Sequence, residues 1–260
     1  IGSELLLPSP WAVVRSFCGL AQTTEFYRSV LHTLLRVAAG FAAGMAAGLL
    51  AGTLTAFSCA ADMLLTPLKN IIKATPVTSF IVLILLYFSS NVTPSAVAFL
   101  AVLPICWSNV CEGLRQTDKK MTELAHAYAF GRKKTLREIY FPAVRPYLSA
   151  AATTGLGFAW KSCVAAEVIA LSKNSVGRAL YESKLYLETA ELFAWTASVV
   201  LISVLFEKLL VHKLFKNKNT EGTAGRRSES LEHGHASCEA ELQYKSDAYA
   251  EYGRDEERNI

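Results

Sequence analysis

The chain has 260 residues, 52% of them hydrophobic, and a formal net charge of +4. Soluble domains hold roughly 45–50% apolar residues, and the excess here is concentrated in residues 1–214, because residues 215–260 contain almost no apolar run. The basic residues gather in short polar segments between apolar runs, which indicates a membrane protein oriented by its loops and argues against a nucleic-acid-binding surface. The six cysteines include no CxxC pair, so we predict no metal site, disulfide framework or cofactor.

The first apolar span is predicted at about residues 30–56, after an external amphipathic lead-in over residues 1–29. A span of this length exceeds the roughly 20 residues that cross a hydrocarbon core of about 30 Å. Four glycines recur within it at every fourth residue, so they share one face of a helix and allow another helix to approach closely. The alternative is a helix that is simply rich in alanine and glycine, but the repeat favours a packed interface. The glycines are Gly40, Gly44, Gly48 and Gly52.

Four further apolar runs follow, at about residues 71–88, 94–110, 139–168 and 189–211. The run at residues 71–88 is long enough to cross the membrane only if its helix begins near Ile71. Pro104 is expected to kink or bend the helix at residues 94–110. With five spans, the positive-inside rule places the Lys69/Lys73 segment, residues 112–138 and the polar tail in the cytoplasm. Residue 1 then lies outside, so a cytoplasmic natural N-terminus would require one further span before Ile1.

The polar segment 112–138 contains an apolar period of i, i+3, i+4 and i+7, which predicts a short amphipathic helix near residues 119–131. We expect one side of this helix to pack under the membrane bundle and the other to face a cytosolic partner. Gly131 is expected to permit a sharp reversal through a positive φ, and Pro142 to open the next helix. The apolar positions are Met121, Leu124, Ala125 and Tyr128, and the polar residues Thr122, Glu123 and His126 fill much of the rest.

At these residues the sequence resembles the permease subunits of ABC importers. That family carries a cytoplasmic E-A-A motif, a Gly four residues after the last Ala, and Ile and Pro at the start of the next helix. Anchored on Pro142, Glu123-Leu124-Ala125 stands at the motif, with Leu124 in place of the middle Ala. Ala129 stands where Gly is usual, and Gly131 follows two residues later. The residues that the resemblance assigns to coupling are Glu123, Leu124, Ala125, His126, Ala129, Gly131, Ile139 and Pro142.

The likeness extends over about residues 4–212 and is similar to the nitrate, sulfonate and taurine branch of the family. It is carried by residues 160–169 and 189–195 and, near the start, by residues 6–10. The resemblance implies an all-α integral membrane protein with a type I importer permease bundle. About five transmembrane helices and a cytoplasmic coupling helix belong to this chain, and a preceding helix is missing from it.

The resemblance also implies a division of labour in a cell-membrane complex. A permease dimer, most simply a homodimer, forms the pathway for the solute. An ABC ATP-binding subunit binds the coupling helix, and an extracytoplasmic solute-binding protein delivers the solute. ATP binds the partner subunit, which agrees with the lack of a G-x-x-x-x-G-K-[ST] phosphate loop in this chain. The chain is therefore expected to be a transport subunit and no enzyme.

Ionisable residues near a predicted span are candidates for the solute pathway, because burying them in a membrane costs several kcal/mol. Lys161 and Glu167 are such candidates, and Lys161 is a hypothetical attractive charge for an anionic solute. Trp160, beside Lys161, is a further possible pathway residue. The alternative is that Lys161 and Glu167 pair with each other or reach the outer interface. Arg36, near the outer end of the first span, is interpreted as an interface anchor rather than a ligand.

Other classes of membrane protein fit the sequence less well. An ion-gradient-driven secondary transporter should show internal repeats and mid-membrane ionisable residues. A vitamin-type coupling subunit should show Ala-Arg-Gly motifs, and a membrane enzyme should show HExxH or GxSxG. The sequence does not identify the solute: the branch favours a small anion such as nitrate, a sulfonate or taurine, but it also includes permeases for vitamin precursors and aromatic compounds.

Overall fold

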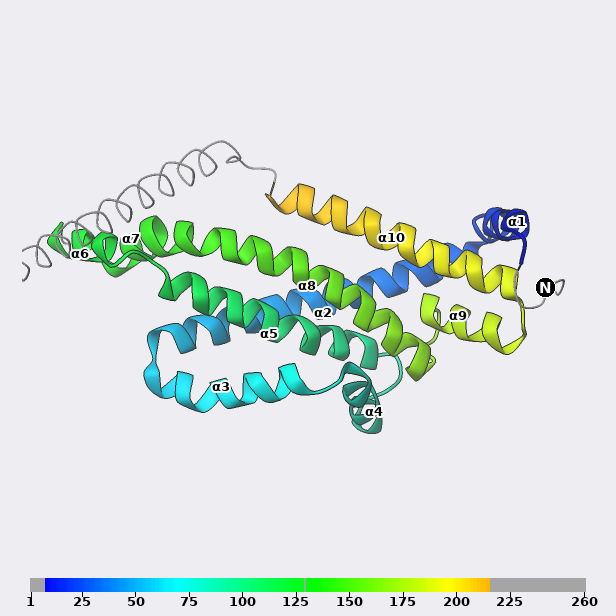
Figure 1. The fold of residues 1–260 in the computed structure, drawn as a ribbon, viewed down its shortest axis with the longest axis horizontal. Coiled ribbons are helices and arrows are strands. Elements are labelled where there is room, and N and C mark those ends of the chain that lie inside the picture. The colour runs from blue at the N-terminus through cyan, green and yellow to red at the C-terminus, as the bar shows by residue number, and fades with distance from the viewer. Residues whose placement is uncertain (1–7, 129, 216–260) are drawn as a thin grey trace, which may run out of the picture. The chain divides into compact units, whose positions relative to one another are not determined.

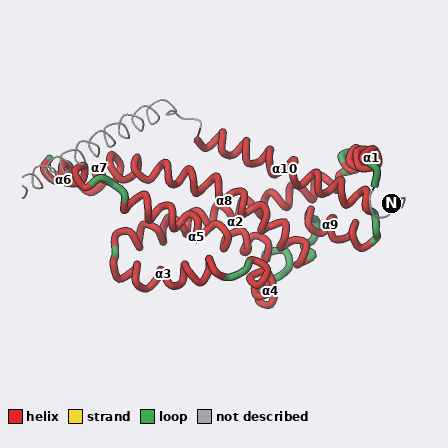
Figure 2. Tube along the Cα trace, viewed as in Figure 1, coloured by secondary structure: helices red, strands yellow, loops and turns green. Residues whose placement is uncertain are grey.

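The computed structural model describes residues 8–215 except Ala129, so almost all of the predicted tail (residues 215–260) lies outside the described residues. Within them, every regular element is helical (Figures 1 and 2), and the predicted all-α class is confirmed. The elements are α1 (Pro10–Leu20), α2 (Thr24–Phe57), α3 (Cys59–Ala74), α4 (Val77–Tyr87), α5 (Thr93–Arg115), α6 (Lys119–Ala127), α7 (Arg132–Thr135), the π-helix η1 (Leu136–Tyr140), α8 (Phe141–Ala170), α9 (Val176–Leu185) and α10 (Thr189–Phe215).

Two helices of the described chain, α2 and α5, are long and apolar enough to cross a membrane. The pair α3 and α4 adds a third candidate if the two are counted as one span. Helix α8 is 30 residues long, but charged side chains interrupt its apolar sequence, and the apolar part of α10 is the shorter stretch Thr189–Leu205. The structure thus contains two or three apolar helices of membrane length, and the count of five spans stays a prediction.

Helices α2 and α5 pack closely along the glycine face. All four glycines are buried, and a Cβ atom built on Gly48 would lie 2.6 Å from the Cβ of Cys106. The partners on α5 advance by four residues for each step of four on α2, so the helices run parallel and in a constant register. Large side chains at these positions would hold the two backbones apart. The facing pairs are Gly40 and Ala98, Gly44 and Val102, Gly48 and Cys106, and Gly52 and Val110.

The predicted continuous helix over residues 71–88 is wrong. Helix α3 ends at Ala74, α4 begins at Val77, and the two helices are bent by 103°. Pro76 explains the break, because proline lacks an amide hydrogen and its ring disfavours the helical conformation of the preceding residue. Thr75 accordingly has φ −77° and ψ 127°, in the extended region.

Helix α8 lies against the α2–α5 pair and completes the core. The main cluster joins residues of all three helices, and α5 runs as one helix from Thr93 to Arg115 with Pro104 buried inside it. Small side chains such as Ala98 and Ala159 allow the three helices to approach, while Trp160 fills the remaining volume. The cluster comprises Val37, Ala98, Val102, Ala159, Trp160, Cys163 and Val164.

Candidate functional site

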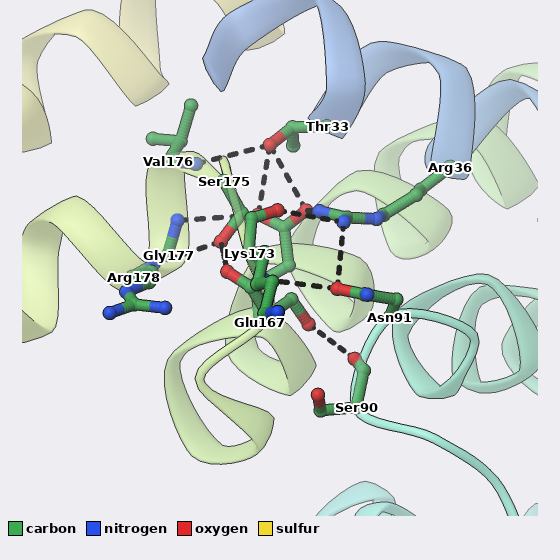
Figure 3. A network of polar contacts seen from close by, with 11 residues as sticks. Thr33, Arg36, Ser90, Asn91, Glu167, Lys173, Ser175, Val176, Gly177 and Arg178 are labelled. Atoms are coloured by element: carbon green, nitrogen blue, oxygen red, sulfur yellow. Dashed lines mark hydrogen bonds and ion pairs between the residues drawn. The ribbon is translucent and has the colours of Figure 1, made fainter. Parts of the chain in front are cut away.

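A buried ion pair joins α2 to the C-terminal end of α8 (Figure 3). The guanidinium of Arg36 lies 2.9 Å from the carboxylate of Glu167, and the Glu167 side chain is 0% exposed. The hydroxyl of Thr33, one turn before Arg36, lies 2.9 and 3.0 Å from the two carboxylate oxygens. The backbone N–H of Gly177 donates a further hydrogen bond of 3.2 Å to the carboxylate. A buried carboxylate is stable only with such a complete set of donors.

The same network holds the turn between α8 and α9 and the turn before α5. Arg36 donates to the backbone carbonyl of Lys173 (2.9 Å), and Asn91 accepts a hydrogen bond from the Lys173 N–H (3.0 Å). Gly177 approaches Glu167 so closely that a Cβ atom there would lie 2.4 Å from the Cβ of Glu167. The turn itself passes through left-handed conformations at Leu171 (φ 50°) and Asn174 (φ 48°). Three distant parts of the chain thus meet around one carboxylate.

Two interpretations of these residues need correction. Arg36 is no interface anchor, because its side chain is 13% exposed and is paired with Glu167. Glu167 does not pair with Lys161, because a helix separation of six residues points the two side chains in different directions. It does not reach the interface either, because its side chain is 0% exposed. Glu167 and Trp160 are both inside the bundle, while Lys161 alone of the three is exposed.

The predicted amphipathic helix is present as α6, but its apolar face is not packed under the bundle. Met121 and Leu124 are each 55% exposed and Tyr128 is 71% exposed, whereas Ala125 is buried. The acidic Glu123 is also exposed, and Asp118 begins the helix by accepting a hydrogen bond from the Lys120 N–H (2.9 Å). The expectation of packing failed because no other segment of the described chain covers this surface.

The reversal after α6 does not use a left-handed glycine. No glycine of the described chain has a positive φ, so the expected role of Gly131 is wrong. Its carbonyl instead accepts the N–H of Lys134 (2.9 Å) and opens α7. A π-helical turn over Leu136–Tyr140 then leads into α8, where Pro142 occupies the first turn, as predicted. Ile139 lies in this π turn, and Ala129 lies outside the described residues.

An ion pair that the sequence did not suggest joins the C-terminal end of α5 to the N-terminal end of α3. Arg115, in the last turn of α5, lies 2.6 Å from the carboxylate of Asp62, in the first turn of α3. The next residue, Gln116, accepts a hydrogen bond from the Tyr147 hydroxyl of α8. The segment that holds α6 therefore starts from a point fixed to two neighbouring helices.

Comparison with known proteins identifies the class of this molecule. The family described as binding-protein-dependent transport system inner membrane component matches residues 44–212. The chain belongs to this family. It is therefore an ABC importer permease of the inner membrane, a transport subunit rather than an enzyme, and a system of this kind implies an ATPase and a binding protein as partners. The predicted family and location are confirmed.

Several curated permeases are similar to the chain over most of their length. The putative aliphatic sulfonates transport permease protein SsuC of Bacillus subtilis is 27% identical over 84% of this chain and 80% of its own. SsuC of Escherichia coli is 27% identical over 80% of this chain and 76% of its own. The riboflavin transport system permease protein RibX of Chloroflexus aurantiacus is 30% identical over 79% of this chain and 80% of its own.

The matched region of the permease contains α6 and one side of the buried ion pair. Glu167 and α6 lie within residues 44–212, while Thr33 and Arg36 lie before the matched region. Residues 160–169, which carried the resemblance, form the part of α8 that ends at the ion pair. The sequence indicated Glu167 but not the partners of its carboxylate, because Thr33 and Gly177 carry no local signal of their role.

Proposed function

We propose that this permease forms the translocation pathway for a small organic anion and that α6 couples it to the ATPase. In this proposal the chain contributes five membrane-crossing elements, including α8 and α10, and it assembles with a second copy of itself. The observation that carries the proposal is the uncovered apolar face of α6, which needs a partner. The equilibrium between two conformations of the bundle would then be biased, through α6, by ATP in the partner subunit.

The surface of α6 has the form of a helix that lies in a groove of another protein. Two large apolar side chains of the nine-residue helix α6, Met121 and Leu124, and a third directly after it, Tyr128, are more than half exposed. Side chains at i, i+3 and i+7 are the usual anchors of such helices. Glu123 lies beside these anchors and is exposed, so its carboxylate is available to a donor on the same partner. This arrangement supports the assignment of Glu123, Leu124 and Ala125 to coupling.

Replacing Leu124 with arginine is expected to release the ATP-binding subunit. Loss of a buried interface anchor costs about 2 kcal/mol or more, which is about thirtyfold in affinity. The measurement is purification of the tagged full-length chain from its native membrane in mild detergent, followed by quantitative mass spectrometry. Glu123→Arg should act in the same direction.

The matched control is Glu182→Arg, a charge change at a half-exposed side chain of α9 that leaves α6 intact. It should recover as much ATP-binding subunit as the unchanged chain. Equal recovery with Leu124→Arg would contradict the coupling role of α6. Failure to recover any ATP-binding subunit with the unchanged chain would argue instead for transport driven by an ion gradient.

The exposed position of Lys161 supports the assignment of an anionic solute. It is exposed on α8, nine residues before the end of the helix at Ala170, which places it about 14 Å along the axis from that end. If Ala170 lies at the outer edge of a hydrocarbon core of about 30 Å, Lys161 lies near the middle of the membrane. A charged side chain at this depth faces water or protein rather than lipid. The similarity to permeases named for aliphatic sulfonates points to the same class of solute.

Lys161→Met is expected to reduce uptake of ethanesulfonate by about tenfold, because one attractive charge is removed from the pathway. Uptake is measured in vesicles that hold the assembled transporter with its binding protein. Lys173→Met is the matched control, because the Lys173 side chain is exposed in the α8–α9 turn and only its backbone joins the network. Unchanged ethanesulfonate uptake in Lys161→Met would show that Lys161 does not attract the solute.

A vitamin or aromatic solute is the second candidate, because RibX, at 30% identity, is named for riboflavin. The same vesicles distinguish the two. Uptake of labelled riboflavin but not of labelled ethanesulfonate would favour the vitamin-type solute. Uptake of labelled ethanesulfonate alone would favour the anion.

A further inference from the structure

Helix α3 carries a continuous polar stripe that the proposed function has not used. With 3.6 residues per turn, its five polar side chains fall within an arc of about 100°. The start and the middle of the stripe contact α5, because Asp62 pairs with Arg115 and the ammonium of Lys69 lies 5.6 Å from the centre of the Trp107 ring. The stripe consists of Asp62, Thr66, Lys69, Asn70 and Lys73.

The opposite side of α3 is apolar and exposed. Leu64 is 75%, Leu68 49% and Ile71 62% exposed. These side chains are suited to lipid or to an apolar protein surface. The helix is therefore amphipathic, with its apolar side turned away from the bundle and its polar side turned toward α5. A surface helix of a soluble protein shows the reverse arrangement.

The depth of the two lysines follows from the ion pair at the start of the helix. Asp62 and Arg115 lie at the end of the bundle from which α6 follows. At 1.5 Å per residue, Lys69 lies about 10 Å and Lys73 about 16 Å further along α3. If this ion pair marks the inner edge of a hydrocarbon core of about 30 Å, these positions reach from the inner third to the middle of the membrane. They then lie deeper than the cytoplasmic placement that the positive-inside rule gave for the Lys69/Lys73 segment. Trp107, beside Lys69, is a buried residue of the apolar helix α5.

Neither lysine forms an ion pair among the described residues, although Lys69 lies near enough to Asp62, the partner of Arg115, to interact with it electrostatically. The three ion pairs among the described residues are Arg36–Glu167, Arg115–Asp62 and Arg178–Glu182. Lys69 is held over an aromatic ring, which attracts a cation but does not neutralise it. Lys73 is exposed. A cation without a counter-charge at this depth needs water or an anion beside it.

We infer that the polar stripe of α3 lines the solute pathway and that Lys69 and Lys73 together bind the anionic head group of the solute. One turn of helix separates the two ammonium groups, so both can contact the oxygens of one sulfonate or carboxylate. Asn70 lies on the same side and adds an amide donor. Trp107 holds Lys69 when no anion is present. This inference rests on the proposed importer function and adds a second group of cations to Lys161.

Cysteine labelling tests the stripe without knowledge of the natural solute. Single cysteines replace the polar residues Thr66, Asn70 and Lys73 or the apolar residues Leu64, Leu68 and Ile71, with Cys18, Cys59 and Cys238 changed to serine. The full chain is kept with its ATP-binding subunit in native membrane vesicles. The probes are two membrane-impermeant methanethiosulfonates, one bearing an ethylsulfonate and one bearing an ethyltrimethylammonium group.

The polar positions are expected to react and the apolar positions to remain unlabelled. At Asn70→Cys the anionic probe should react faster than the cationic one. Adding Lys69→Met and Lys73→Met should lower the ratio of anionic to cationic rates by about tenfold, because electrostatic steering is lost. Unreactive polar positions, equally reactive apolar positions, or an unchanged ratio would each overturn the inference.

The same preparation separates this inference from the proposed function. Recovery of the ATP-binding subunit with the unchanged chain reports on the importer assignment alone. If that subunit is recovered but the polar positions stay unlabelled, the α3 pathway is wrong and the importer stands. If the polar positions are labelled but no ATP-binding subunit is recovered, the proposed coupling through α6 is overturned while α3 still borders an aqueous path.

Discussion

Arg36→Met is expected to lower the free energy of unfolding of this permease by about 3–5 kcal/mol, the usual cost of removing one partner of a buried ion pair. The reason is the environment of Glu167, whose side chain is 0% exposed. Without the guanidinium, this carboxylate keeps only the Thr33 hydroxyl and the Gly177 N–H as donors. The carbonyl of Lys173 also loses its hydrogen bond from Arg36. The α8–α9 turn should therefore loosen together with the bundle.

Thermal unfolding of the purified chain in detergent, followed by tryptophan fluorescence, measures this effect. The double variant Arg36→Met, Glu167→Gln should recover part of the loss, because the uncompensated charge is gone while an amide still accepts from Thr33 and Gly177. Arg178→Met is the control, since its pair with Glu182 is exposed by 42% and 45% and is worth about 0.5 kcal/mol or less. Equal effects of Arg36→Met and Arg178→Met would show that the Glu167 network does not stabilise the bundle.

The ion pair shows why the sequence predicted the helices better than the site. The long apolar runs and the glycine repeat are local patterns, and they correspond to α2 and α5. Arg36 and Glu167 are 131 residues apart, and nothing in the neighbourhood of either residue identifies the other. The interpretation of Arg36 as an interface anchor was reasonable for an isolated helix. It failed because the turn after α8 folds back over the outer end of α2.

The prediction of one helix over residues 71–88 failed for a different reason. The Thr75-Pro76 step is a local signal for a helix end, but the length needed for a membrane span was given more weight. The structure follows the local rule, and the helix turns by 103°. Most of the polar stripe, Asp62 to Asn70, lies before the predicted span at residues 71–88, and Lys69 of the stripe lies beside Trp107.

The exposed face of α6 illustrates a third limit. The apolar period was read correctly as a helix, but its packing partner was assumed to lie in the same chain. Ala125 alone of the four apolar positions is buried. No segment of the described chain covers the other three side chains. A periodic pattern predicts that a face will be covered, but it does not tell which molecule covers it.

Gly48→Ala is expected to destabilise the permease by about 1–3 kcal/mol through overpacking, despite the better helix propensity of alanine. The added Cβ atom would lie 2.6 Å from the Cβ of Cys106 and 2.9 Å from the carbonyl oxygen of Leu103. Neither neighbour can move without moving α5, because one is a Cβ atom and the other is backbone. Gly48→Leu should go further and prevent the α2–α5 pair from closing, so that little folded chain is recovered from the membrane.

Gly157→Ala on α8 is the matched control, because a Cβ atom there would meet nothing within 4 Å. The same substitution in the same kind of helix should stabilise the chain by about 0.5–1 kcal/mol, since alanine restricts the unfolded chain more than glycine does. The two alanine variants are compared by their thermal midpoints in detergent. Opposite signs would establish that the glycine face of α2 is present because the two helices touch there. A stabilising effect at both positions would mean that the α2–α5 contact is looser than the distances indicate and that the glycines reflect composition alone.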